Sequence, residues 1–309
     1  MNDLRERVLG QLRHVVIGQD DVAELMLSAV VLGGHVLLQG VPGVAKSLLA
    51  NAFARTLDAD YRRVQFTPDM LPSDLTGTMT LRAGELAFRP GPVFANVLLA
   101  DEINRTPPKT QSALLEAMQE RQVSLDGTPH PLPDPFLVVA TQNPIEYEGT
   151  YPLPEAQLDR FLFQAEVGYP EPADELDVLR LSRRGVASPA LAQIEPVLSA
   201  GEIASACRLV DATTVSDEVL GYVVAVVRAT RTLPSVSLGA SPRAAVHLLA
   251  AAKARARFAE RDFVTPDDVA TMALPVLRHR LVLTPEAELE RFGPADAVAS
   301  ALASVPVPR

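Results

Sequence analysis

The stretch LLQGVPGVAKSLLA, residues 37–50, has the outline of a phosphate-binding loop placed between a strand and a helix. Its small residues let backbone N–H groups turn toward phosphate oxygens, and the start of the following helix adds a partial positive charge. Lys46 would reach the β- and γ-phosphates of a nucleotide, and the Ser47 hydroxyl would bind Mg²⁺. Ala45 replaces the last glycine of the usual pattern, which the loop tolerates if the φ angle of that residue is negative. The stretch predicts a nucleotide site, with an ordinary glycine-containing turn as the alternative.

The first half of the chain alternates short apolar runs with helical patterns. The runs are compact, mostly aliphatic and bounded by turn residues, as expected for strands buried on both faces of a parallel sheet. They cover residues 35–39, 61–66, 96–100, 136–140 and 161–167. Two segments between them, 46–57 and 109–120, place large apolar residues at helical spacing. The alternation predicts an α/β domain.

Two acids and an amide follow the ends of two predicted strands. Asp101 and Glu102 end the run NVLLADE, and Asn143 follows the run FLVVA. Because open α/β sheets bind ligands beyond the carboxyl ends of their strands, these side chains are expected near the phosphate loop. Asp101 would hold Mg²⁺ through water, Glu102 would act as general base, and Asn143 would orient the attacking water or touch the γ-phosphate. The alternative is that the acids only cap the next helix and that Asn143 belongs to a turn.

The second part of the chain has a different sequence pattern. From about residue 195 helix starts dominate, and no aliphatic run predicts a further strand. Ser199 and Glu202 fit a capping box, and Ser241 and Thr265 each stand before a proline at the first position of a predicted helix. This part is therefore predicted to be a small all-helical domain.

Composition limits the partners and the compartment that we expect. The formal net charge is −10, with three lysines among 28 basic residues, which disfavours nucleic acid as a partner. The charged start MNDLRERV argues against a signal peptide, and no apolar stretch reaches the roughly 18 residues of a membrane span. The single cysteine, Cys207, fits a reducing compartment, so a cytoplasmic protein without membrane insertion is expected. The five histidines lack ligand spacing, which indicates no metal besides Mg²⁺.

The chain resembles the MoxR family of AAA+ ATPases from about residue 15 to residue 300. The resemblance is carried by VIGQ (16–19), GVPGVAKS (40–47), QFTPDMLPSDLTG (65–77), RPGPVFANVLLADEINR (89–105), LLEAMQERQVSLDG (114–127), VVATQNPIEYEGTYPLPEAQLDRF (138–161) and SPRA (241–244). It implies an α/β fold, an AAA+ P-loop NTPase core in which helices flank a parallel sheet, followed by a C-terminal all-helical lid domain. The expected ranges are 1–168 for the core, 169–194 for a connecting segment and 195–309 for the lid.

Matching positions imply the family's nucleotide-binding roles, with ATP and Mg²⁺ as cofactors. Lys46 and Ser47 match the Walker A lysine and hydroxyl. Asp101 and Glu102 match Walker B, and Asn143 matches sensor 1. Ser47 and Asp101 would hold the metal. The residues expected around the nucleotide are Ile17, Gly18, Gly40, Val41, Pro42, Gly43, Val44, Ala45, Lys46, Ser47, Leu48 and Asp101.

The resemblance also implies two arginines and a switch residue. Arg160, in LDRF, corresponds to the arginine finger that acts on the ATP of a neighbouring subunit. Arg243, in SPRA, corresponds to sensor 2, which reaches ATP from the lid. Gln65 resembles the polar switch residue that restrains the catalytic glutamate. An arginine supplied by a neighbour would complete the site only after assembly, so ATPase activity is expected to require a ring.

Two predicted hairpins, at about 76–92 and 122–135, resemble the helix-2 insert and the pre-sensor 1 hairpin of related rings. They carry few basic residues, whereas a ring that translocates DNA needs a positive track. The resemblance implies a homo-oligomeric ring, expected to be a hexamer, that remodels, matures or assembles protein clients, which often contain a von Willebrand factor A domain. The alternatives are a chelatase-type motor subunit, a nucleic-acid-acting motor, and an ATP-binding scaffold without turnover.

Overall fold

A parallel sheet of five strands forms the centre of the protein. The computed structural model describes residues 1–41, 43–82, 85–143, 149–182 and 189–308. The strands lie in the order β2-β5-β8-β1-β9, and every pairing is parallel. They span Val36–Gln39 (β1), Tyr61–Gln65 (β2), Val97–Asp101 (β5), Leu137–Gln142 (β8) and Phe163–Glu166 (β9). Each strand begins and ends within two residues of a predicted run, so the predicted α/β alternation is confirmed.

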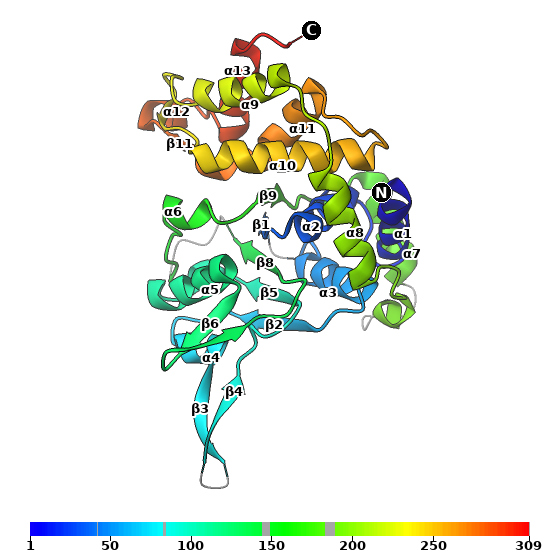
Figure 1. Ribbon diagram of the computed structural model, residues 1–309, viewed down its shortest axis with the longest axis vertical. Helices are drawn as coiled ribbons and strands as arrows, with labels where there is room; N and C mark the ends of the chain where they lie inside the picture. The colour runs from blue at the N-terminus through cyan, green and yellow to red at the C-terminus, as the bar shows by residue number, and fades with distance from the viewer. Residues whose placement is uncertain (42, 83–84, 144–148, 183–188, 309) are drawn as a thin grey trace.

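Helices cover both faces of this sheet (Figure 1). The helices that share a core with one face are α1 (Asn2–Leu12), α2 (Asp20–Leu32) and α3 (Lys46–Thr56). Those on the other face are α4 (Pro72–Thr76) and α5 (Pro108–Glu120). Successive residues of β5 alternate between the two cores, with Val97 in the first and Leu98 in the second. Burial of both faces explains why the strands appear in the sequence as continuous apolar runs.

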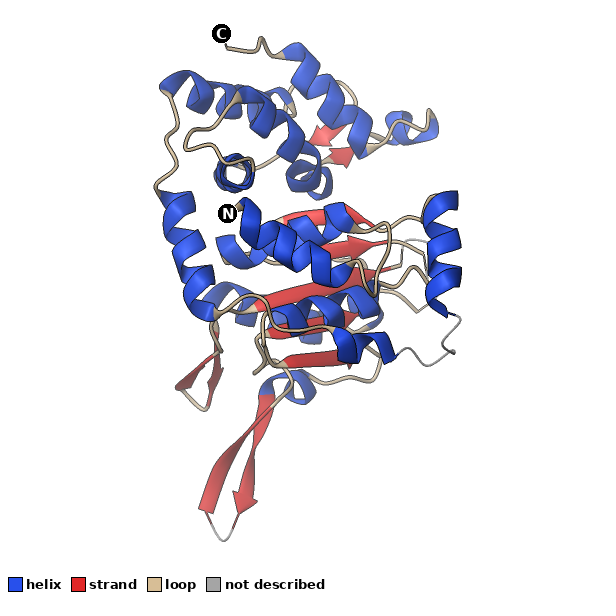
Figure 2. Cartoon of the chain, turned by 90° about the vertical axis from the view of Figure 1, so that its right-hand side faces the viewer, coloured by secondary structure: helices blue, strands red, loops and turns tan. Residues whose placement is uncertain are grey.

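Both predicted hairpins are present. The first pairs β3 (Gly77–Arg82) with β4 (Glu85–Pro90), and it projects well beyond the rest of the molecule (Figures 1 and 2). The second pairs β6 (Gln122–Leu125) with β7 (Thr128–Pro131). Its turn residues Asp126 and Gly127 both have positive φ, at 48° and 78°, which suits the right-handed twist of a tight hairpin.

The C-terminal third is mainly helical and packs over one end of the sheet, where α11 contacts β9 and α10 contacts α2. Its helices are α8 (Ala200–Asp211), α9 (Asp217–Ala229), α10 (Pro242–Phe258), α11 (Pro266–Leu277), α12 (Pro285–Leu289) and α13 (Pro294–Ser304). The predicted capping box before α8 is confirmed, since the Ser199 N–H donates to the Glu202 carboxylate at 2.9 Å. Elsewhere the chain forms α6 (Glu155–Leu158), α7 (Pro172–Ser182) and the short 3-10 turns η1 (Ile103–Arg105), η2 (Pro189–Gln193) and η3 (Arg278–Arg280).

The prediction that no strand follows residue 195 is wrong. β10 (Val236–Leu238) and β11 (Val282–Leu283) form a small antiparallel pair that joins two distant loops. Strands of three and two residues are too short to show alternation, so a sequence pattern does not reveal them. None of the helices in the described ranges combines the length and the apolar character that a membrane span requires.

Candidate nucleotide site

The predicted phosphate-binding loop and the acidic end of β5 lie side by side. The loop leaves β1, a central strand of the sheet, and α3 begins directly at Lys46. The Lys46 Nζ donates a hydrogen bond to the carbonyl oxygen of Gly40 at 2.6 Å. The Ser47 hydroxyl donates to Asp101 Oδ2 at 3.1 Å, although 54 residues separate them in the chain. The parallel sheet thus brings a lysine, a hydroxyl and a carboxylate to one edge, at the carboxyl ends of its strands.

The backbone of the loop has a left-handed residue at Ala45. Its φ angle is 61°, so the condition of a negative φ is not met and alanine takes the left-handed conformation that a glycine would take. This conformation occurs where the loop turns into α3, and it costs about 1–2 kcal/mol for a residue with a Cβ. Gly40 has a different constraint, because an added Cβ would collide with the carbonyl oxygen of Val167. Pro42 lies outside the described residues.

Asp101 is the buried centre of the site. The whole residue is 7% exposed, and its carboxylate oxygen Oδ1 accepts a hydrogen bond from Thr141 Oγ1 at 2.6 Å. Its Oδ2 accepts from Ser47 and from the Arg63 guanidinium, whose Nη2 lies 2.7 Å away. Burial alone would raise the pKa of the Asp101 carboxyl, but the hydrogen bonds from Thr141, Arg63 and Ser47 outweigh it and lower the pKa. Asp101 is therefore an anion at neutral pH.

Glu102 is held by its neighbours and does not cap the next helix. Its backbone has φ 57°, and its side chain makes no capping hydrogen bond to η1. The carboxylate oxygen Oε2 accepts a hydrogen bond from Gln65 Nε2 at 2.6 Å and pairs with Arg105 Nε at 3.0 Å. The side chain remains 28% exposed. The capping alternative therefore does not account for Glu102, whereas a restrained carboxylate at the site does.

Other predicted site residues follow β8, lie in the loop before α3 or at its start, or precede α2. Asn143 follows β8 directly and is 5% exposed, beside the strand that ends at Asp101. Within the loop and the start of α3, Val44 is buried, Val41 and Leu48 are half-buried, and Gly43 is exposed. Ile17 and Gly18 lie before α2, with Gly18 at φ 74°, and an added Cβ at Gly18 would collide with the Asp174 carboxylate of α7.

Arg160 and Arg243 each lie within two residues of a polar cluster around the buried Arg280 side chain. Arg280, whose side chain is 2% exposed, donates from Nε to Asp159 Oδ1 at 2.7 Å. The Ser241 hydroxyl donates to Asp159 Oδ2 at 3.2 Å. Asp159 precedes Arg160, and Ser241 lies two residues before Arg243, so this cluster joins the segment before β9 to the start of α10. Arg160 is half-buried and Arg243 is exposed.

Replacing Asp159 with alanine is expected to destabilise the fold by about 3–5 kcal/mol, because the buried Arg280 guanidinium would lose its counter-charge. The free energy of unfolding from urea titrations measures this loss. Asp177→Ala is the matched control, since its partner Arg180 is 70% exposed and such pairs contribute about 0–1 kcal/mol. A loss for Asp159→Ala no larger than that of the control would contradict the prediction.

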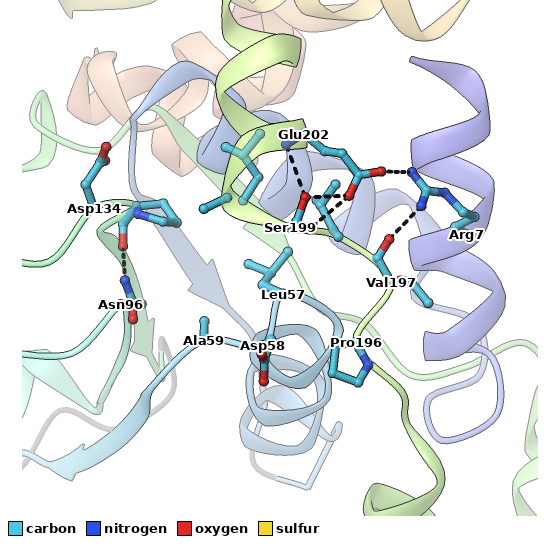
Figure 3. A pocket seen from close by; sticks show the side chains of 14 residues that line it. Arg7, Leu57, Asp58, Ala59, Asn96, Asp134, Pro196, Val197, Ser199 and Glu202 are labelled. Atoms are coloured by element: carbon cyan, nitrogen blue, oxygen red, sulfur yellow. Dashed lines mark hydrogen bonds and ion pairs between the residues drawn. The ribbon is translucent and has the colours of Figure 1, made fainter.

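A separate hollow of about 700 Å³ lies at the opposite, amino-terminal edge of the sheet (Figure 3). Its charged lining groups pair with one another: Arg7 donates to Glu202 Oε1 at 2.7 Å and to the carbonyl oxygen of Val197 at 2.8 Å. Hydrogen bonds from the Ser199 backbone and from Arg7 lower the pKa of Glu202 to about 2. This shift belongs to a helix cap with an ion pair, so the hollow does not compete with the carboxyl edge as a catalytic site.

Comparison with known proteins identifies the family. The family model described as "ATPase family associated with various cellular activities (AAA)" matches residues 35–163, and an "AAA lid domain" model matches residues 228–301. The chain is 46% identical to Chaperone MoxR1 of Mycobacterium tuberculosis, over 98% of this chain and 82% of that protein. It is 33% identical to Protein MoxR of Methylorubrum extorquens, over 99% and 96%. The chain belongs to the MoxR family of AAA+ ATPases.

A solved structure supports the MoxR fold throughout. A crystal structure of a candidate ATPase from Cytophaga hutchinsonii superposes with a TM-score of 0.91 at 40% identity, covering 100% of this chain and 96% of that one. The five-stranded sheet with its flanking helices is thus a MoxR AAA+ core, and the C-terminal helices form the lid. The predicted family and fold class are confirmed.

Among the contacts of this MoxR chain that were not predicted from the sequence, three are between elements far apart in the chain. They are the hydrogen bond from Thr141 to Asp101, the pair between Arg63 and Asp101, and the buried pair between Arg280 and Asp159. One signal was available for Arg63, because it lies two residues before Gln65 and so on the same face of β2. The pair of Arg280 with Asp159 spans 121 residues, and no local pattern indicates it.

Proposed function

We propose that this MoxR-family chain binds ATP with Mg²⁺ and hydrolyses it to ADP and phosphate. The observation that supports the proposal most directly is the 3.1 Å hydrogen bond between Ser47 and Asp101, with Glu102 as the next residue. A phosphate-binding loop, a buried carboxylate and a second, partly exposed carboxylate at one sheet edge form the set of groups that phosphoryl transfer to water needs.

The oxygen donors at this edge fit Mg²⁺. Hydroxyl and carboxylate oxygens are the hard ligands that this ion prefers, and Ser47 and Asp101 would hold it. When bound, the ion would neutralise charge on the β- and γ-phosphates. Lys46, which now donates to the Gly40 carbonyl, would turn toward the same phosphates. Ser47 and Asp101 therefore fit Mg²⁺, and Lys46 fits the phosphates of ATP.

Glu102 and Asn143 would serve the attacking water in this proposal. Glu102 would accept its proton as general base, and Asn143 would orient it from the end of β8. Gln65 would act as the switch residue, because its amide holds Glu102 Oε2 at 2.6 Å. Release of that hydrogen bond would free the carboxylate to turn toward water.

We further propose that the chain works as a homo-oligomeric ring, hexameric as the family resemblance implies. Arg160 would act on the ATP of the neighbouring subunit, and Arg243 on the ATP of its own subunit from the start of α10. The work would be chaperone-like remodelling, maturation or assembly of protein clients, with a von Willebrand factor A domain as the expected client type. The name Chaperone MoxR1 of a relative supports this reading.

The test measures phosphate release at increasing protein concentration, with and without Mg²⁺, alongside the mass in solution by light scattering. We expect release to require Mg²⁺, to rise per subunit as the ring assembles, and to be absent in Lys46→Ala. Addition of DNA or RNA should leave the rate unchanged. Mg²⁺-independent release, or equal release by Lys46→Ala, would refute the proposed site, and activity of a monomer would refute the ring.

A further inference from the structure

Arg63 lies against the proposed metal site although the proposed chemistry gives it no role. It lies on β2, next to β5, and its guanidinium contacts a single oxygen of Asp101 with two donors. Nε lies 3.1 Å and Nη2 lies 2.7 Å from Asp101 Oδ2. The Asp101 side chain is 10% exposed, whereas that of Arg63 is 53% exposed. The pair thus joins a fixed, buried anion to a cation that has room to move into solvent.

The contacted oxygen is the one that faces Ser47. The Ser47 hydroxyl donates to the same Oδ2 at 3.1 Å, so hydroxyl, carboxylate and guanidinium meet at one atom. Ser47 and Asp101 are the residues that would hold Mg²⁺. A guanidinium and a divalent cation at one carboxylate oxygen repel each other, since neither is neutral at any ordinary pH. Arg63 and the metal therefore compete for Asp101.

The same guanidinium is connected to the proposed general base. Arg63 Nη2 donates to Gln65 Oε1 at 3.3 Å, and Gln65 Nε2 donates to Glu102 Oε2 at 2.6 Å. The amide of Gln65 is held from both ends, with its oxygen toward Arg63 and its nitrogen toward Glu102. If Arg63 leaves, the amide keeps only one of these two partners. The position of Arg63 therefore affects how firmly Gln65 holds the Glu102 carboxylate.

We propose that Arg63 is a positioning residue. It binds Asp101 Oδ2, the oxygen beside Ser47, when no Mg²⁺ is bound, and it leaves this oxygen when Mg²⁺ and nucleotide bind. Its departure loosens the hydrogen bond between Gln65 and Glu102, so Glu102 becomes available only when the metal is in place. The inference rests on the function proposed above and adds a residue that links metal binding to release of the base. A half-exposed ion pair is weak, which suits a contact that has to break in every cycle.

The test follows binding of a fluorescent ADP analogue while MgCl₂ is titrated, so no turnover is needed. Removing the competitor in Arg63→Met should lower the Mg²⁺ concentration for half-maximal binding by about three- to tenfold. Arg63→Lys keeps the charge without the planar fork and should give an intermediate value. The variant Arg62→Met is the control, since it removes the same charge one residue away, where Arg62 is 60% exposed and pairs with Asp60 at 3.4 Å. It should stay within about twofold of the parent.

A second measurement addresses the link to Glu102. Gln65→Ala and Arg63→Met, alone and combined, form a double-mutant cycle on the Mg²⁺ dependence of the hydrolysis rate. The proposal predicts that Gln65→Ala changes this dependence less in the Arg63→Met background than in the parent, because the two residues act through one hydrogen-bonded chain. Purely additive effects would overturn the link.

Two outcomes of the titration have separate meanings. If the parent binds the analogue and Arg63→Met needs as much Mg²⁺ as Arg62→Met, or more, Arg63 does not compete with the metal and this inference alone is overturned. If the parent binds no nucleotide at any Mg²⁺ concentration, the proposed function itself fails. Should Arg63→Met fold poorly by circular dichroism, the comparison of Arg63→Lys with Arg62→Lys decides the matter in the same way.

Discussion

Replacing Glu102 with glutamine is expected to lower the rate constant of ATP hydrolysis by about 10²–10⁴-fold while ATP stays bound. The amide has nearly the shape of the carboxylate but cannot accept a proton from water, and a general base contributes about this factor. Glu102 is 28% exposed and held by Gln65 and Arg105, so its removal leaves no buried charge unpaired. Single-turnover measurement of phosphate release, with retention of labelled ATP on the protein, gives both quantities.

The control for this experiment is Glu120→Gln, the same chemical change at the exposed end of α5. It should leave both hydrolysis and ATP retention at the level of the parent. If Glu102→Gln hydrolyses ATP as fast as the parent, the assignment of Glu102 as general base is wrong, and the scaffold or another base has to be considered. If it hydrolyses slowly but also loses ATP, Glu102 serves binding more than proton transfer.

The central sheet could be predicted because each strand is buried on both faces and therefore forms a continuous apolar run. The placement of Asp101 near Ser47 followed from the rule that parallel strands present their carboxyl ends at one edge, and the structure places the two side chains in contact. The conformation of Ala45 did not follow, because a backbone angle depends on the path of the whole loop. Only the structure shows that an alanine occupies a left-handed position there.

The polar contacts around the site were beyond sequence reasoning for a different reason. Arg63 and Asp101 are 38 residues apart, and their contact depends on which strand lies next to β5. The order of strands in a parallel sheet has no signature in a single sequence. The burial of Arg280 was unpredictable for the same reason. Three basic residues in a row, the RHR of η3, are typical of an exposed turn, yet the Arg280 side chain is 2% exposed. The sequence therefore shows which residues are charged but not which of them form contacts.

Replacing Arg160 with alanine is expected to lower ATP hydrolysis by about 10³–10⁵-fold without weakening nucleotide binding, the range known for arginine fingers. The structure holds the backbone on both sides of this residue in place. Phe161 is fully buried, and Asp159 is held by Arg280, so the residues on both sides of Arg160 are anchored while Arg160 itself stays half-buried. Arg180→Ala, at an exposed position of α7, is the control for loss of one positive charge and should leave hydrolysis unchanged.

Mixing two inactive variants distinguishes action on a neighbour from action within one subunit. Arg160→Ala keeps its own Glu102, and Glu102→Gln keeps its own Arg160. In a head-to-tail ring assembled from equal amounts, about one quarter of the sites would combine an intact Glu102 with an intact Arg160 from the next subunit. Hydrolysis should therefore recover to about a quarter of the parent rate when the variants are mixed before assembly. If Arg160 acts on its own subunit, no site in the mixture is complete, and the mixture stays as inactive as its components.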